Sequence, residues 1–112
     1  MTINSKQKGK RGELELAAWL KDHGFTARRG QQFKGTPDSP DVVVAEWPWA
    51  HIECKRVQKL NLRAAMEQAQ NDAGNKIPLV IHRTNDKPWL VTLSLADFIE
   101  LVSGHDSFDF AE

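Results

Sequence analysis

Three consecutive valines, Val42–Val44, limit the possible folds of this chain more than any other segment. β-branched side chains favour strands, and an apolar run without polar alternation predicts a strand that is covered on both faces. Such a strand needs other structure packed on both sides of its sheet, which predicts the α/β class. With 112 residues, the chain is expected to form one domain over residues 1–112.

The spacing of apolar residues and of turn-forming residues predicts the element order αβββαββα. A helix is expected over residues 12–23 and ends at Gly24, a second is capped by Asn61 and ends at Gly74, and a third runs from Ser94 through Val102. Strands are expected over 25–29, 42–45, 50–56, 77–82 and 89–93. Residues 1–8 are expected to be a basic arm and 104–112 an acidic, flexible tail. The segment 47–49 (WPW) is expected to be a packed turn, with a dimer contact or a wedge that stacks on DNA bases as the alternatives.

The charges of the chain are polarised although their sum is zero, with 15 basic and 15 acidic side chains. Residues 1–63 carry 12 basic and 7 acidic side chains, a net charge of +5, and residues 64–112 carry 3 and 8, a net charge of −5. The basic residues are clustered, which favours a face that binds a polyanion such as DNA, with a merely solvated surface as the alternative. The candidate DNA-binding residues are Lys8, Lys10, Arg11, Arg28, Arg29, Lys34, Arg56, Lys59 and Arg63.

Cys54 is the only cysteine, so an internal disulfide and a cysteine-based zinc site are excluded. The chain also lacks the apolar core of a signal peptide and any apolar stretch long enough for a membrane span. We therefore expect a cytoplasmic protein, located in the host cytoplasm if a phage encodes it, with no membrane partner and no small-molecule cofactor.

Three carboxylates fall where an apolar core would not place them. Glu13 is at the head of the apolar stripe of the first helix, Asp41 opens the valine strand, and Glu53 shares a strand face with His51 and Lys55. Carboxylates that are brought together repel one another, and a divalent cation such as Mg²⁺ relieves the repulsion. A nearby lysine can hold a phosphate and orient a water, so the set points to phosphodiester hydrolysis.

Each of these residues also has a structural interpretation when it is taken alone. Glu13 can be an acid that the dipole of its helix favours, Asp41 a turn residue, and Glu53 with Lys55 an ion pair on one strand. Their joint order and spacing favour a nuclease.

The segment Pro40-Asp41, eleven residues, then Glu53-Cys54-Lys55 resembles the signature of the PD-(D/E)XK nuclease superfamily. Within it, the segment 8–16 (KGKRGELEL), the pair Gly24-Phe25 and the arginine pair 28–29 are most similar to archaeal-type, Hjc-like Holliday junction resolvases and their phage relatives. The resemblance implies a restriction-endonuclease-like αβββαβ core, with a central mixed β-sheet flanked by helices.

The resemblance also implies individual functions for the matching residues. Asp41, Glu53 and the backbone carbonyl of Cys54 would bind Mg²⁺, for which Mn²⁺ substitutes, and Glu13 would bind the metal directly or through water. Lys55 would be the catalytic lysine. Further matches are Ser39, which would touch the scissile phosphate, Gln68, which would support the site, and Arg11, which would contact DNA near the cut.

These residues predict an endonuclease that cuts branched DNA, above all four-way junctions. Symmetric resolution of a junction needs two cuts, and a homodimer with one site per subunit supplies both. Two alternatives remain open at this point. One is a phage nicking or replication-repair (VRR-NUC-like) endonuclease that is not restricted to junctions, and the other is a non-catalytic DNA-binding module with the same fold.

Overall fold

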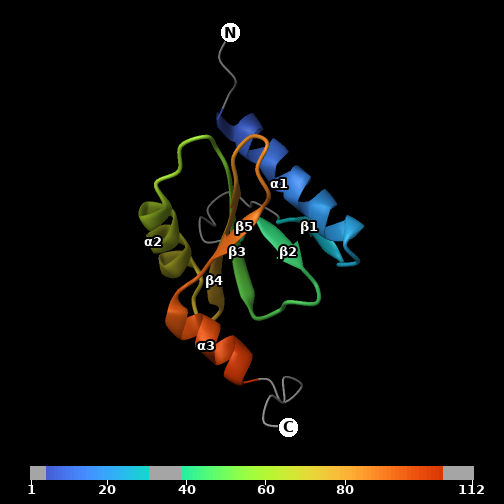
Figure 1. The fold of residues 1–112 in the computed structure, drawn as a ribbon. Helices are drawn as coiled ribbons and strands as arrows, with labels where there is room; N and C mark the ends of the chain where they lie inside the picture. The colour runs from blue at the N-terminus through green and yellow to red at the C-terminus, as the bar shows by residue number, and fades with distance from the viewer. Residues whose placement is uncertain (1–4, 31–38, 105–112) are drawn as a thin grey trace.

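The computed structural model describes residues 5–30 and 39–104, and its element order is the predicted αβββαββα (Figure 1). The elements are α1 (Ser5–Asp22), β1 (Ala27–Arg29), β2 (Val42–Val44), β3 (Ala50–Arg56), α2 (Leu62–Asp72), β4 (Ile77–Arg83), β5 (Leu90–Thr92) and α3 (Leu95–Ser103). Asn61 caps α2 by accepting a hydrogen bond from the amide of Ala64, and Ser94 caps α3 through the amide of Asp97. The Asn61 cap was expected from the sequence, and Ser94 is the residue at which the third helix was expected to begin.

The five strands form one mixed sheet in the order β1-β2-β3-β4-β5. β3 and β4 are parallel and α2 connects them, whereas the other neighbouring pairs are antiparallel. A parallel pair needs a long crossover connection, and α2 supplies it. The predicted fold class, an α/β protein with a central mixed sheet flanked by helices, is confirmed.

Helices cover both faces of the sheet, and Figure 1 shows α1 and α2 on opposite sides of it. Leu16 and Leu20 of α1 pack into the main core with alternate residues of β3 and β4, among them Ile52 and Ile81. On the other face, the small side chains of α2 pack on Val80. Strands β3 and β4 are therefore the ones covered on both faces.

The structure differs from the sequence prediction at the valine strand. Val42 and Val44 are buried, but Val43 between them is only half-buried. The reason is that α2 lies over β3 and β4, so the face of β2 that carries Val43 has no helix packed on it.

The first helix begins at Ser5, seven residues before the predicted start at Gly12. Residues 5–8 of the predicted basic arm are therefore helical, while residues 1–4 lie outside the described part of the chain. Gly12 lies inside the helix, at a point where α1 crosses β3 closely. A side chain would not fit there, because a Cβ atom at Gly12 would lie 2.6 Å from the Cβ of Arg56. The glycine that seemed to mark a helix start instead marks a close contact between helix and strand.

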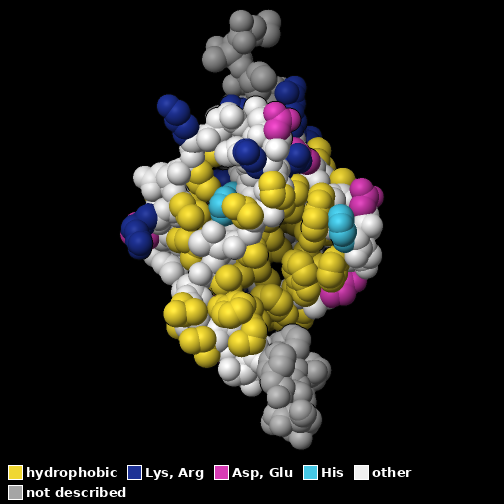
Figure 2. All heavy atoms as spheres, in the orientation of Figure 1, with side chains coloured by type: hydrophobic (Ala, Val, Ile, Leu, Met, Phe, Trp, Pro, Cys, Tyr) yellow, Lys and Arg dark blue, Asp and Glu magenta, His cyan; other side chains and the backbone are white. Residues whose placement is uncertain are grey.

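An apolar surface lies on the side of β5 and α3 (Figure 2). No residue of α3 is buried, and exposed apolar side chains extend from the edge strand onto this helix. These are Leu90, Val91, Leu95, Phe98 and Ile99. Beside them is a groove of about 250 Å³ with only apolar side chains, and Trp47 and Trp49, the predicted packed turn, form part of its wall and also pack on the core. Among the described residues, no helix is long and apolar enough to cross a membrane.

The close contact at Gly12 predicts opposite effects for two glycine substitutions in α1. Gly12→Ala should lower the free energy of unfolding by about 1–3 kcal/mol, because the added methyl group forces helix and strand apart. Gly9→Ala should raise it by about 0.5–1 kcal/mol, since alanine favours the helix and the nearest atom to the new Cβ is 4.0 Å away. Urea unfolding of both variants measures this, and equal effects would contradict the close contact.

Candidate active site

One cavity of about 320 Å³ brings together residues that are far apart in the sequence. It lies where the first half of α1 and one side of α2 meet the C-terminal half of β3. Its lining residues are Lys8, Gly9, Glu13, Asp41, Glu53, Cys54, Lys55, Arg56, Val57 and Gln68. We call this cavity the carboxylate pocket, because Glu13, Asp41 and Glu53 meet in it.

Most of the predicted site residues therefore share this pocket, including Lys55 and Gln68. Ser39 is half-buried two residues before Asp41 but does not line the pocket. Lys34 lies outside the described residues.

Backbone contacts fix Asp41 between two strands. Its amide donates to the carbonyl of Ile52 over 2.8 Å, and its carbonyl accepts from the amide of Gly30 over 2.8 Å. Gly30 must lack a side chain, because a Cβ there would lie 2.0 Å from the carbonyl oxygen of Pro40. Asp41 Oδ2 in turn accepts a hydrogen bond from the amide of Cys54 over 2.9 Å. The backbone amide of Cys54 thus aligns the carboxylate of Asp41 with β3.

The other two carboxylates are each anchored by a side chain. Glu13 Oε1 accepts from Arg29 Nε over 2.6 Å, so β1 holds the carboxylate of α1. Glu53 Oε2 and His51 Nε2 are 2.9 Å apart within β3. In all three groups one carboxylate oxygen has a protein donor, which fixes the orientation of the other oxygen.

Burial and mutual repulsion make this pocket unfavourable for three negative charges. Glu13 and Glu53 are buried, with 8% and 4% of their surface exposed. Loss of hydration, and next the charge of Glu53, raise the pKa of Asp41 from its ordinary 3.8 to about 7, although the hydrogen bond from the Cys54 amide lowers it. Hard oxygen donors under such repulsion fit a divalent cation such as Mg²⁺.

Cys54 contributes its backbone to the pocket rather than its thiol. The side chain is packed in the core beneath α1, and burial raises the pKa of the thiol far above its ordinary value. Because the amide and carbonyl of one strand residue point the same way, the Cys54 carbonyl points toward the side on which Asp41 lies. The predicted carbonyl ligand is compatible with this arrangement.

A second cavity, of about 250 Å³, adjoins the carboxylate pocket through shared residues. We call it the basic groove, and it is lined by Lys8, Arg11, Gly12, Glu15, Arg56, Val57, Gln58 and Asn85. Glu15 in this groove binds two arginines, Arg56 over 3.0 Å and Arg83. Lysine and arginine side chains gather at this end of the molecule, around the first turns of α1 (Figure 2).

The predicted DNA-binding residues fall into two groups in the structure. The exposed ones are Lys8, Lys10, Arg11, Arg28, Lys59 and Arg63. Arg29 and Arg56 are half-buried and form ion pairs with Glu13 and Glu15. Their guanidinium groups hold the carboxylates of Glu13 and Glu15 in α1. The count of basic residues in the sequence does not indicate this function.

Sequence reasoning assigned no function to His51, Asp72 or Arg83. Strand alternation did place His51 on the face of Glu53, and that signal could have identified the contact between them. Asp72 and Arg83 reach this region only through the packing of α2 and β4, which no local pattern reveals.

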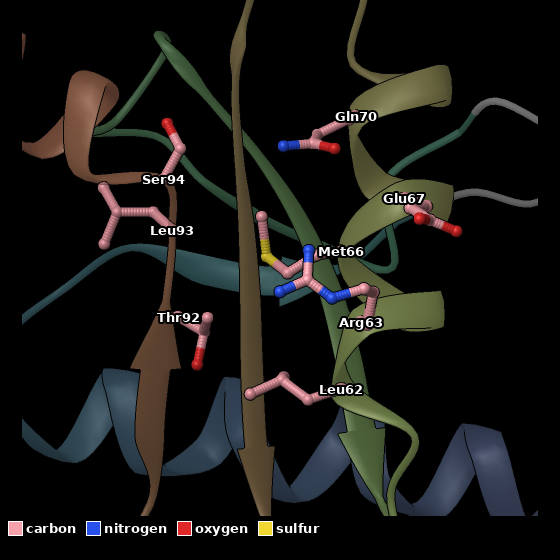
Figure 3. A pocket seen from close by; sticks show the side chains of 8 residues that line it. All are labelled: Leu62, Arg63, Met66, Glu67, Gln70, Thr92, Leu93 and Ser94. Carbon is pink, nitrogen blue, oxygen red and sulfur yellow. The ribbon is translucent and has the colours of Figure 1, made fainter.

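A larger cavity of about 370 Å³ lies elsewhere, between α2 and β5 (Figure 3). Leu62, Arg63 and Met66 project from α2 toward Thr92 and Leu93. Glu67 is the only carboxylate among its lining residues, so it lacks the convergent acids of the carboxylate pocket. The smaller cavity is the better candidate for chemistry.

Comparisons with known proteins agree with this geometry. The family described as "Archaeal holliday junction resolvase (hjc)" matches residues 4–92. The chain is also similar to the solved structure of Hjc, a Holliday junction resolvase from the archaeal hyperthermophile Archaeoglobus fulgidus. The TM-score is 0.56 and the sequence identity 27%, and the match covers 77% of this chain and 72% of that one. No curated protein matches the sequence.

The repulsion in the pocket predicts that Asp41→Asn stabilises the metal-free protein. Asparagine can still accept from the Cys54 amide, but it removes one of the three charges. Because folding raises the pKa of Asp41, its ionised form opposes folding, fully above pH 7 and less as the pH falls toward 4. At pH 8 with EDTA, we expect a gain of about 1–2 kcal/mol in the free energy of unfolding.

Thermal unfolding at pH 8 and at pH 5 measures this gain, which should shrink at the lower pH. Asp22→Asn, at the exposed end of α1, makes the same change of charge outside the pocket and should have little effect. A lower stability of Asp41→Asn at pH 8 would show that the carboxylate is not under repulsion.

Proposed function

Because the chain belongs to the archaeal Holliday junction resolvase (Hjc) family, we propose that it is a Mg²⁺-dependent endonuclease that resolves four-way DNA junctions as a homodimer. The observation that carries the proposal is the carboxylate pocket, where Glu13, Asp41 and Glu53 meet beside Lys55, next to the basic groove. The family relation supports a nuclease. The pocket supports the metal dependence.

In the proposed reaction Asp41, Glu53 and the Cys54 carbonyl would hold Mg²⁺, and Glu13 would complete the site. The cation would activate a water and neutralise charge on the attacked phosphate. Lys55 holds a phosphate oxygen and stabilises the charge that develops in the transition state. Gln68, from α2, keeps its amide at the rim of the same pocket.

Branched DNA as the substrate is supported by the basic end of the molecule. Lys8, Lys10 and Arg11 lie within one turn near the start of α1, and Lys8 and Arg11 line the basic groove. Lysine and arginine side chains bind the phosphate backbone without reading the base sequence. A surface of this kind suits recognition of the shape of a junction.

A homodimer is supported by the apolar surface of β5 and α3. β5 is an edge strand, and Leu90 and Val91 on it are more than half exposed, as are Leu95 and Ile99 on α3. Such a contiguous apolar surface marks an interaction site. The exposed side chains Leu90, Val91, Leu95, Phe98 and Ile99 are apolar, so two copies can bury them against each other, and each copy would bring one carboxylate pocket.

Removal of the proposed metal ligand or lysine should abolish cutting while DNA binding persists. We expect Glu53→Gln and Lys55→Ala each to lower the rate of junction cleavage in Mg²⁺ by at least about 100-fold. Binding to the same junction in EDTA should change by less than about threefold for Glu53→Gln. Gel assays measure both quantities, with Glu67→Gln on the exposed side of α2 as the matched control.

Cleavage that survives in Glu53→Gln would contradict the proposed metal site. Cleavage of linear duplex at the rate of the junction would instead favour the nicking endonuclease. Junction binding without any cutting by the unaltered protein would favour the non-catalytic module.

A charge in the apolar surface should dissociate the dimer. Phe98→Glu should convert the protein to a monomer in analytical ultracentrifugation, because it would bury two carboxylates at the interface. Leu14→Glu on α1 is a matched control, since Leu14 and Phe98 are both 48% exposed, and it should stay dimeric. A dimeric Phe98→Glu variant would place the interface elsewhere.

A further inference from the structure

We infer that His51 is a positioning residue for Glu53. It fixes one oxygen of that carboxylate so that the other is presented to the divalent cation, and Asp72 supports it from the end of α2. The inference rests on the proposed metal-dependent function. None of the family motifs contains His51, and it does not line the carboxylate pocket, so it acts only through Glu53.

His51 occupies a position where a strand inside a sheet normally has an apolar side chain. It is 3% exposed, on the face of β3 that α2 covers. Burial of an imidazole costs free energy unless the ring has a hydrogen-bonding partner. Its partner is Glu53 Oε2, 2.9 Å from Nε2, and both side chains are at most 5% exposed. A hydrogen bond shielded from water in this way holds both groups in one orientation.

The direction of this hydrogen bond follows from its chemistry. An ionised carboxylate only accepts, so His51 Nε2 carries the hydrogen and donates it to Glu53. One polar atom from each of His51, Glu53 and Asp72 lies within 4.8 Å of the other two, which places a second acid near the ring. A carboxylate near an imidazole helps to fix its orientation and tautomer.

The consequence for the metal site is geometric. Mg²⁺ requires near-octahedral coordination at short distances, so a carboxylate that rotates freely binds it poorly. With Oε2 of Glu53 held by His51, the other oxygen remains for the pocket, just as the Cys54 amide fixes Asp41 and Arg29 fixes Glu13. Loss of a partner of this kind typically costs 10–100-fold in metal affinity.

The same three residues could in principle hold a cation of their own, since a histidine and two carboxylates are common ligands. The 2.9 Å contact argues against this, because it puts a hydrogen between His51 and Glu53 where such a cation would bind both. The test therefore counts metal ions as well as measuring affinity.

The experiment compares two substitutions of equal length, His51→Gln and His51→Met. Glutamine keeps an N–H donor near the position of Nε2, whereas methionine has none. Calorimetric titration with Mn²⁺, without DNA, should show at least about 10-fold weaker binding for the methionine variant and a change within about threefold for the glutamine variant. The Mg²⁺ concentration that gives half-maximal junction cleavage should rise in parallel, while saturating Mg²⁺ restores the maximal rate.

Asp72→Asn should weaken Mn²⁺ binding less than His51→Met does, and Asp22→Asn, an exposed acid with the same change, should have no effect. Circular dichroism checks folding, and His51→Phe replaces the methionine variant if that one is unfolded.

Three results would overturn the inference: unchanged Mn²⁺ affinity without the donor, equal losses in the glutamine and methionine variants, or a second Mn²⁺ that binds the unaltered protein and is lost with His51. Because the Mn²⁺ titration needs no DNA, it tests the inference about His51 separately from the proposed function. If the unaltered protein does not cut a junction, the proposed function is wrong, but the effect of His51 on Mn²⁺ binding can still be measured.

Discussion

The repulsion among three carboxylates in one pocket is the constraint around which this structure is arranged. Glu13 lies in α1, Asp41 directly precedes β2 and Glu53 lies in the middle of β3, and each is held by a donor from a different source. Burial makes the arrangement costly without a cation, as the raised pKa of Asp41 shows. A protein gains nothing in stability from such a cluster, so its presence indicates function.

Two glycines make the convergence possible. Gly12 lets α1 approach β3 so closely that Glu13, one residue later, enters the pocket. Gly30 lets the chain pass against Pro40 and bind the carbonyl of Asp41 through its amide. Gly12 and Gly30 are thus requirements of packing, because a side chain at either position would collide with the neighbouring backbone or side chain.

The sequence was sufficient for the fold class, the element order and most of the residues that share the pocket, although Ser39 does not line it. These depend on local periodicity and on strand alternation, which placed Glu53 and Lys55 on one face. It was not sufficient for the start of α1, because two glycines weakened the helical signal. It also could not pair Glu15 with Arg83, since that contact depends on how β4 packs beside β3.

The molecule has a basic end at the start of α1 and an apolar surface at β5 and α3 (Figure 2). In the proposed function the basic end would face DNA, and the apolar surface would face a second subunit. The most direct measurement maps the cuts that the unaltered protein makes in Mg²⁺ on a four-way junction labelled on each strand. We predict two symmetrical nicks in opposing strands, with linear duplex of the same sequence left intact. Equal cutting of the linear duplex, or single unpaired nicks, would contradict it.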